Sequence, residues 1–133
     1  MVVQYVPSLI DYDCNNTEEI DYNRFLRVVD DYSNGNVNDD DIDYFESSDF
    51  YFIFDDEELV GMGEVRHNLK LLGVNTHGHI ACGSRPSKRK NGYAYEATRS
   101  MVDKLKEDNI DEVVLCNYSE NNISLKIISK LNF

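Results

Sequence analysis

Apolar positions in the middle of the chain repeat with a period of two residues, which is typical of strands. The aromatic run at 49–54, the acidic turn DDEE and the run at 59–67 predict an antiparallel hairpin. A further strand is expected at 77–84. Gly61 and Gly63 lie two residues apart and share one strand face, so we expect another element to pack closely against that face.

From Gly92 onward the apolar period changes to that of a helix. The positions i, i+3, i+4, i+7, i+8 and i+11 predict one buried stripe, made of Ala94, Ala97, Thr98, Met101, Val102 and Leu105. The residues at 124–131 predict a last helix, with Asn121 or Ser119 as its N-cap. Between the two helices, the apolar run at 110–116 predicts a short buried strand.

The first half of the chain contains weaker patterns. The β-branched run at 2–6 predicts a first strand, and the stretch at 17–32 predicts a helix that begins with acidic residues. A shorter helix is expected at 38–46, and the stretch at 68–76 is interpreted as a connector. These segments supply the elements that precede the hairpin.

The predicted order is strand, helix, short helix, three strands, helix, strand, helix. The final strand–helix–strand unit implies a right-handed parallel crossover. A chain of 133 residues fits one domain with a modest core. We therefore expect one α/β domain over residues 1–133, with a mixed central sheet flanked by helices on both faces.

Charge is distributed unevenly along the chain, whose net charge is -12. Residues 1–60 contain 17 acidic and 2 basic residues, whereas residues 61–133 contain 8 acidic and 11 basic residues. The acidic half repels a phosphate backbone, so nucleic acid is not expected as a partner. It favours a cationic partner or substrate, and the alternative is a solvated acidic face that keeps the protein soluble.

Several classes of protein are excluded by what the sequence lacks. No apolar run approaches the roughly 20 residues that span a bilayer, and the first residues do not resemble a signal peptide. We expect a cytoplasmic protein without a membrane partner. The cysteines, Cys14, Cys82 and Cys116, follow no zinc-binding spacing and are interpreted as reduced, buried thiols. His77 and His79 share a strand face, but no third ligand is evident, so no metal is expected.

The stretch RPSKRKNGYAYEA, residues 85–97, places four basic side chains within six residues just before a predicted helix. A helix N-terminus presents unpaired N–H groups and a partial positive charge, which together attract anions. Gly92 and Ala94 let a ligand approach the backbone closely. The stretch therefore predicts a site for a phosphate or pyrophosphate, and the alternative is an exposed basic turn. Neither of the common phosphate-loop patterns, GxxxxGK[ST] or GxGxxG, is present.

The loop RKNGYA fits the pattern [QR]-x-x-G-x-[GA] and resembles the acyl-CoA-binding loop of the GNAT superfamily of N-acetyltransferases. The blocks GMGEVRHNL, GHIACGSRPSKRKNGYAYEA and VVLCNYSENNISLKIISKLNF are similar to successive blocks of one bacterial branch of that superfamily. The resemblance extends from about Asp49 to Phe133, with a weaker match at 20–32. It implies a GNAT-like fold and acetyl-CoA as the co-substrate.

Carried onto this chain, the resemblance implies that the amides of residues 90–94 hold the pyrophosphate of acetyl-CoA. It implies a sheet that splays open after the strand at 81–84, which pairs with the pantetheine arm. The implied cofactor-binding residues are Ala81, Cys82, Gly83, Ser84, Arg89, Lys90, Asn91, Gly92, Tyr93, Ala94, Asn121 and Ser124.

Direct acetyl transfer needs a group that takes a proton from the attacking amine. Glu64, on a central strand, is the candidate base, and the alternative is a salt bridge between Glu64 and Arg66. Many members of the superfamily have a Tyr on the last helix that protonates the leaving thiolate, but this chain has Ile128 there. Tyr118 or water is the candidate acid.

The superfamily continues with two further strands beyond the last helix of this sequence, so we expect a C-terminally truncated domain. A strand at 111–116 then has an open edge, which favours a homodimer. The expected function is transfer of an acetyl group from acetyl-CoA to a primary amine of a small-molecule or peptidyl acceptor. The alternative is a weakly active or inactive module that binds CoA or another protein.

Overall fold

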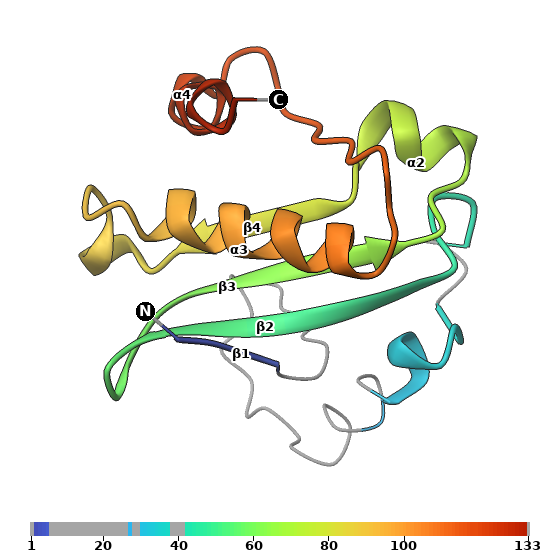
Figure 1. The fold of residues 1–133 in the computed structure, drawn as a ribbon, viewed down its shortest axis with the longest axis horizontal. Helices are drawn as coiled ribbons and strands as arrows, with labels where there is room; N and C mark the ends of the chain where they lie inside the picture. The colour runs from blue at the N-terminus through green and yellow to red at the C-terminus, as the bar shows by residue number, and fades with distance from the viewer. Residues whose placement is uncertain (1, 6–26, 28–29, 38–41, 133) are drawn as a thin grey trace, which may run out of the picture.

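The computed structural model describes residues 2–5, 27, 30–37 and 42–132. Four strands are present in these ranges: β1 Val2–Tyr5, β2 Ser47–Asp55, β3 Glu58–His67 and β4 Ile80–Ser84. The helices are α2 Leu71–Thr76, α3 Tyr93–Glu107 and α4 Asn122–Lys130, with a single 3-10 turn at Pro86–Lys88. Figure 1 shows helical segments on both sides of the sheet, which confirms the predicted α/β class.

The strands form one sheet in the order β1-β2-β3-β4, and every neighbouring pair is antiparallel. The predicted hairpin is confirmed, since β2 and β3 pair from Ser47 opposite His67 to Asp55 opposite Glu58. Its two-residue connection uses Asp56 in a left-handed conformation with a φ of 51°. Aspartate tolerates the left-handed conformation because its short polar side chain can hydrogen-bond to the nearby backbone.

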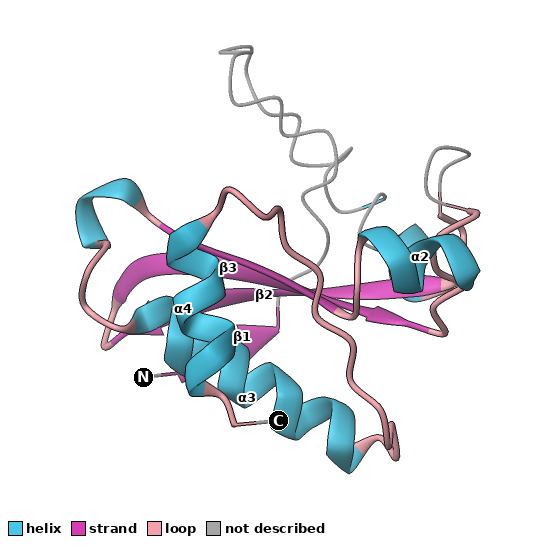
Figure 2. Cartoon of the chain, turned by 90° about the horizontal axis from the view of Figure 1, so that it is seen from above, coloured by secondary structure: helices cyan, strands magenta, loops and turns pink. Residues whose placement is uncertain are grey.

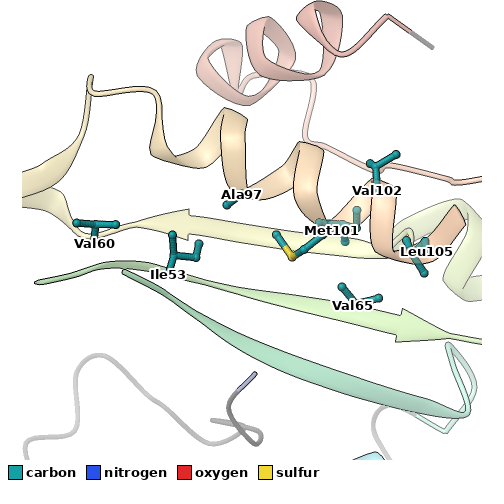
Figure 3. Packing of buried hydrophobic residues seen from close by; sticks show 8 residues of the cluster. Ile53, Val60, Val65, Ala97, Met101, Val102 and Leu105 are labelled. Atoms are coloured by element: carbon teal, nitrogen blue, oxygen red, sulfur yellow. The ribbon is translucent and has the colours of Figure 1, made fainter. Parts of the chain in front are cut away.

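Helix α3 covers one face of the sheet and buries its predicted stripe. Ala97, Thr98, Met101, Val102 and Leu105 are buried, as the spacing predicted. In Figure 3 the apolar side chains of this helix lie over those of β2 and β3. The apolar faces of the helix and the sheet therefore remove each other from water, which is the main stabilising term of such a core.

The two glycines of β3 meet the close neighbours that their spacing predicted. A Cβ atom at Gly63 would lie 2.7 Å from the Sδ and Cε atoms of Met101, so the end of the Met101 side chain packs directly over this glycine. A Cβ atom at Gly61 would lie 2.5 Å from the carbonyl oxygen of Gly83 in the neighbouring strand. The missing side chains allow both α3 and β4 to approach the middle of β3.

The stretch interpreted as a connector instead contains α2. This helix packs against the turn at 42–46 through Gly73, where a Cβ atom would lie 1.9 Å from the carbonyl oxygen of Tyr44. The backbone N–H of Lys70 donates to the same carbonyl at 2.9 Å. The apolar residues of α2 were missed because most face solvent; Leu71 is 78% exposed.

The predicted helix at 38–46 is wrong for its described part, since residues 42–46 form a turn and an extended link. Turn residues and acids compete with helix formation there. The predicted helix at 17–32 lies mostly outside the described residues, but Arg27 and residues 30–33 are helical. No helix in the described ranges is long and apolar enough to cross a membrane.

The predicted parallel strand at 110–116 is also wrong. Residues 110–116 form no strand, since 111 and 112 are in a bend, and they meet the sheet through one isolated antiparallel bridge between Gly78 and Leu115. The reason is a side chain: the N–H of Val114 donates to Nδ1 of His79 at 2.9 Å. An imidazole nitrogen thus takes the place of a strand carbonyl, and the ladder does not continue.

Candidate functional site

A cavity of about 640 Å³ opens between β4 and the segment at 115–118. One wall consists of Ile80, Ala81 and Cys82 of β4, and the opposite wall consists of residues 115–118. Helix α3 contributes Ala94 and Thr98 to the lining.

Helix α4 and the end of α2 complete the lining. From α4 and its N-cap come Asn121, Ser124, Ile127 and Ile128. The far end is formed by residues 75–77 together with Arg66. Figures 1 and 2 show that α4 lies on the same side of the sheet as α3.

The two walls are joined at one end and separate toward the other. The backbone N–H of His79 donates to the carbonyl of Val114 at 2.7 Å, and the Val114 N–H returns a bond to the imidazole. Beyond this junction, no described residue pairs with the outer edge of β4. The cavity lies beyond this junction, between β4 and residues 115–118, which form no strand.

The basic loop leads directly into α3. Lys90 and Gly92 both have left-handed backbones, with φ of 65° and 83°. Alternation of this kind turns successive N–H groups toward one side, which creates a concave anion-binding surface. Among the described residues, none accepts a hydrogen bond from the backbone N–H groups of residues 90–94. These donors therefore point outward at the positive end of a helix of 15 residues.

Side chains around the loop stabilise its shape. Asn91 donates to the carbonyls of Lys88 and Arg89 at 3.0 and 3.1 Å. Lys88 forms an ion pair with Glu58 of the hairpin, with Nζ and Oε2 2.7 Å apart. The hydroxyl of Tyr93 donates to Asp55, and this hydrogen bond raises the pKa of Tyr93. The loop is thus tied to the hairpin on one side.

The structure places the twelve predicted cofactor residues in three adjoining sets. Five line the cavity: Ala81, Cys82, Ala94, Asn121 and Ser124. Gly83 and Ser84 continue β4 beyond that lining, opposite Met62 and Gly61. Arg89, Lys90, Asn91, Gly92 and Tyr93 form the loop and first turn that follow. One continuous path therefore connects the loop to the cavity through β4 and α3.

Cys82 is a neutral part of the cavity wall. Burial raises the pKa of its thiol to about 11, and a hydrogen bond with Thr98 offsets part of that rise. The thiolate is the nucleophilic form, so this thiol is unreactive near neutral pH. The structure supports the interpretation of Cys82 as a small filler.

Glu64 forms the salt bridge that was weighed against its role as a base. Its Oε2 atom lies 2.6 Å from a terminal nitrogen of Arg66, and both side chains are nearly buried. Arg66 also donates to the carbonyls of His77 and Gly78 at 3.0 and 3.2 Å, and its guanidinium lies 5.6 Å from the ring of Phe45. Arg66 thus fixes the chain at the start of β4.

Tyr118 lies at the mouth of the cavity and is 82% exposed. The side chain of Asn117 donates to the carbonyls of Tyr118 and Asn121, at 2.8 and 3.1 Å. Asn121 in turn caps α4, since its side chain accepts from the N–H of Ser124 at 3.2 Å. Asn121 was expected as an N-cap, whereas the role of Asn117 carried no recognisable signal in the sequence.

The cavity lining is mostly uncharged. Arg66 is the one permanently charged side chain among the described residues that line it, and it is already paired with Glu64. Carboxamides, hydroxyls, thiols and the imidazole of His77 supply the remaining polar groups. In the described ranges, no group of three His, Cys, Asp or Glu residues is placed to hold a metal ion. The lining suits a neutral, elongated ligand with amide groups.

The comparisons with known proteins gave one match. The family model described as "Acetyltransferase (GNAT) family" matches residues 15–133. No curated protein and no solved structure matches the chain. The match covers the loop, both cavity walls and the last helix.

Proposed function

The chain belongs to the GNAT family of acetyltransferases, and on that premise we propose that it transfers an acetyl group from acetyl-CoA to a primary amine. The carrying observation is the set of outward-facing N–H groups at residues 90–94, at the end of a 640 Å³ cavity. Acetyl-CoA combines an anionic pyrophosphate with a long neutral arm. The loop fits the first part, and the largely uncharged cavity fits the second.

In this proposal each group of residues has a separate task. Arg89 and the amides of residues 90–94 hold the pyrophosphate. The wall at 81–84 and Ala94 contact the pantetheine arm, while Asn121 and Ser124 lie beside the thioester. Binding along this path places the thioester between the cavity walls.

The acceptor is proposed to be a small-molecule or peptidyl amine. The acidic first half favours a cationic acceptor, although that charge is not part of the described cavity lining. A cytoplasmic location and a homodimer are further proposals. The acid that protonates the leaving thiolate is Tyr118 or water, because Ile128 occupies the position of the usual Tyr.

The test is acetyl-CoA-dependent release of free thiol across a panel of amines. Lys90→Gln is expected to weaken acetyl-CoA binding about fivefold, since it removes one cation from the pyrophosphate site. Lys106→Gln, at the opposite end of α3, is the matched control and should bind acetyl-CoA as the wild type does. Equal affinity in both variants would contradict the proposed site.

A second function is favoured by the salt bridge of Glu64 and by Ile128. The salt bridge occupies the carboxylate that was expected to act as the base, and Ile128 stands where many family members have the Tyr that protonates the thiolate. The alternative function is therefore binding of CoA without acetyl transfer. Thermal stabilisation by acetyl-CoA without thiol release from any amine identifies this alternative. No stabilisation at all contradicts both functions.

A further inference from the structure

The loop before α3 is attached to the end of the β2–β3 hairpin at two points. Lys88, in the 3-10 turn, forms its ion pair with Glu58, the first residue of β3. Tyr93, the first residue of α3, donates its hydroxyl hydrogen to a carboxylate oxygen of Asp55, the last residue of β2. Asp55 and Glu58 face each other as the final pair of the hairpin, so one pair of residues holds both ends of the loop. Figures 1 and 2 show the hairpin turn and the loop at the same end of the sheet.

The two attachments differ in burial and therefore in strength. Lys88 and Glu58 keep 30% and 51% of their side chains exposed, and ion pairs at the surface contribute little. The bond between Tyr93 and Asp55 is partly buried, and the ring of Tyr93 packs against the hydrophobic core. A hydrogen bond to a carboxylate is also stronger than one between neutral groups. The bond between Tyr93 and Asp55 is therefore the main attachment of the loop.

The backbone between these attachments adopts a conformation that needs support. Lys90 has a φ of 65°, and the left-handed region is unfavourable for a residue with a Cβ atom. Such a conformation persists only where surrounding contacts determine it. The side chain of Asn91 holds the carbonyls of Lys88 and Arg89, which both precede Lys90. On the far side of Lys90, the support comes from the side chain of Tyr93.

We propose that Tyr93 and Asp55 are positioning residues, whose hydrogen bond holds the N–H groups of residues 90–94 in the arrangement that accepts a pyrophosphate. The inference rests on the proposed function, in which these N–H groups bind acetyl-CoA. A loop that is already held in its binding conformation loses less conformational freedom when the ligand binds, so the affinity is higher. Neither side chain lines the cavity: Tyr93 acts through its own backbone, and Asp55 acts through Tyr93.

The charge of the hairpin end separates this role from a purely electrostatic one. Residues 55–58 are all acidic, and a carboxylate close to the loop repels a pyrophosphate. If Asp55 acted only through its charge, removal of its carboxylate would strengthen the binding of acetyl-CoA. The positioning role predicts the opposite result, because the loop loses the acceptor that holds Tyr93.

The test is the dissociation constant of acetyl-CoA, measured by calorimetry in four variants. Tyr93→Phe keeps the ring and removes the hydroxyl, so binding is expected to weaken about fivefold. Asp55→Ala removes the acceptor and should have a similar effect. Asp55→Asn removes the charge but keeps an oxygen that accepts from Tyr93, so its affinity should stay within about twofold of the wild type. The double variant Tyr93→Phe/Asp55→Ala should bind no more weakly than either single variant, because both changes remove the same bond.

Tyr95, two residues further along α3, provides the matched control. No described residue forms a hydrogen bond with its hydroxyl, so Tyr95→Phe should bind acetyl-CoA as the wild type does. Thermal unfolding without ligand shows that each variant is folded at the temperature of the titration. In turnover assays, Tyr93→Phe should raise the KM of acetyl-CoA and leave kcat and the KM of the amine unchanged. A general loss of folded protein would lower kcat instead.

The outcomes separate this role from the proposed function. If the wild type binds acetyl-CoA and Tyr93→Phe binds it equally well, the positioning role fails and the proposed function stands. The same conclusion follows if Asp55→Ala binds more tightly than the wild type, or if Asp55→Asn binds as weakly as Asp55→Ala. If the wild type binds acetyl-CoA but acetylates no amine, only acetyl transfer fails, and the dissociation constants still decide the positioning role. If the wild type does not bind acetyl-CoA, both proposals fail.

Discussion

At the scale of single residues, hydrogen bonds from side chains to the backbone shape the site. His79 ends a strand ladder by accepting the Val114 N–H, and Arg66 fixes two carbonyls at the start of β4. Asn121 begins α4 by capping it. Each of these polar residues holds a backbone segment in one position. The stability of the core comes from the apolar side chains.

The residue-scale prediction concerns the effect of pH on stability through His79. Burial lowers the pKa of His79 in the folded state. As the pH falls through about 6.5, the unfolded chain therefore binds more protons than the folded protein does. The contribution of His79 to stability is therefore full above that pH and decreases below it, until the folded-state pKa is passed.

Urea unfolding between about pH 8 and pH 5 measures this effect. His79→Asn retains an acceptor for the Val114 N–H and has no titratable ring, so its free energy of unfolding should depend less on pH. A pH dependence that is identical in the wild type and in His79→Asn contradicts the prediction.

At the scale of elements, the junction between β4 and the segment at 114–116 controls the cavity. Gly78 lies at this junction with a φ of 64°, in the left-handed region that favours glycine. A Cβ atom there would lie 2.7 Å from the Val114 carbonyl oxygen and 2.8 Å from the Cys116 nitrogen. The close approach of two backbones is what joins the walls at one end.

The element-scale prediction follows from that contact. Gly78→Ala is expected to lower the free energy of unfolding by about 3 kcal/mol, because the backbone is strained and both neighbours are rigid. Gly83→Ala is the control: a Cβ there meets nothing within 4 Å, so a change within about 0.5 kcal/mol is expected. Denaturant unfolding without acetyl-CoA measures both. Equal stability of the two variants is incompatible with the described junction.

At the scale of the whole molecule, the core and the cavity adjoin each other along the buried stripe of α3. One side of the helix buries its apolar stripe on the sheet, and Ala94 and Thr98 contribute to the cavity lining. Helix α4 has no fully buried residue and contributes half-buried side chains to the same cavity. A ligand that fills the space therefore adds contacts to α4 that the protein alone does not supply.

The prediction at this scale is that acetyl-CoA stabilises the entire fold. At a concentration of about 100 times its dissociation constant, a ligand that binds the folded state adds about 2.7 kcal/mol. Thermal unfolding across a concentration series of acetyl-CoA measures the shift, and adenosine is the control because it lacks the pyrophosphate and the pantetheine arm. Equal shifts with both compounds contradict binding along the proposed path.

Much of this protein was predictable from local pattern. The hairpin, the stripe of α3 and the glycine face of β3 follow from the spacing of residues, because each period fits one type of backbone. The basic loop before α3 was also predictable, because its residues are consecutive in the chain. Helix α2 was not, since its apolar residues are exposed and its position depends on a contact between Gly73 and Tyr44.

The sequence by itself determined the family, the α/β class and the basic loop before α3, since these depend on residues that are close together in the chain. The tertiary structure selected the salt bridge between Glu64 and Arg66 from the two roles expected for Glu64. It alone decided two other features: the replacement of the strand at 110–116 by one bridge, and the position of His77 at the cavity. Each depends on atoms from distant segments. A side chain that competes with a strand for a hydrogen bond has no periodic signature.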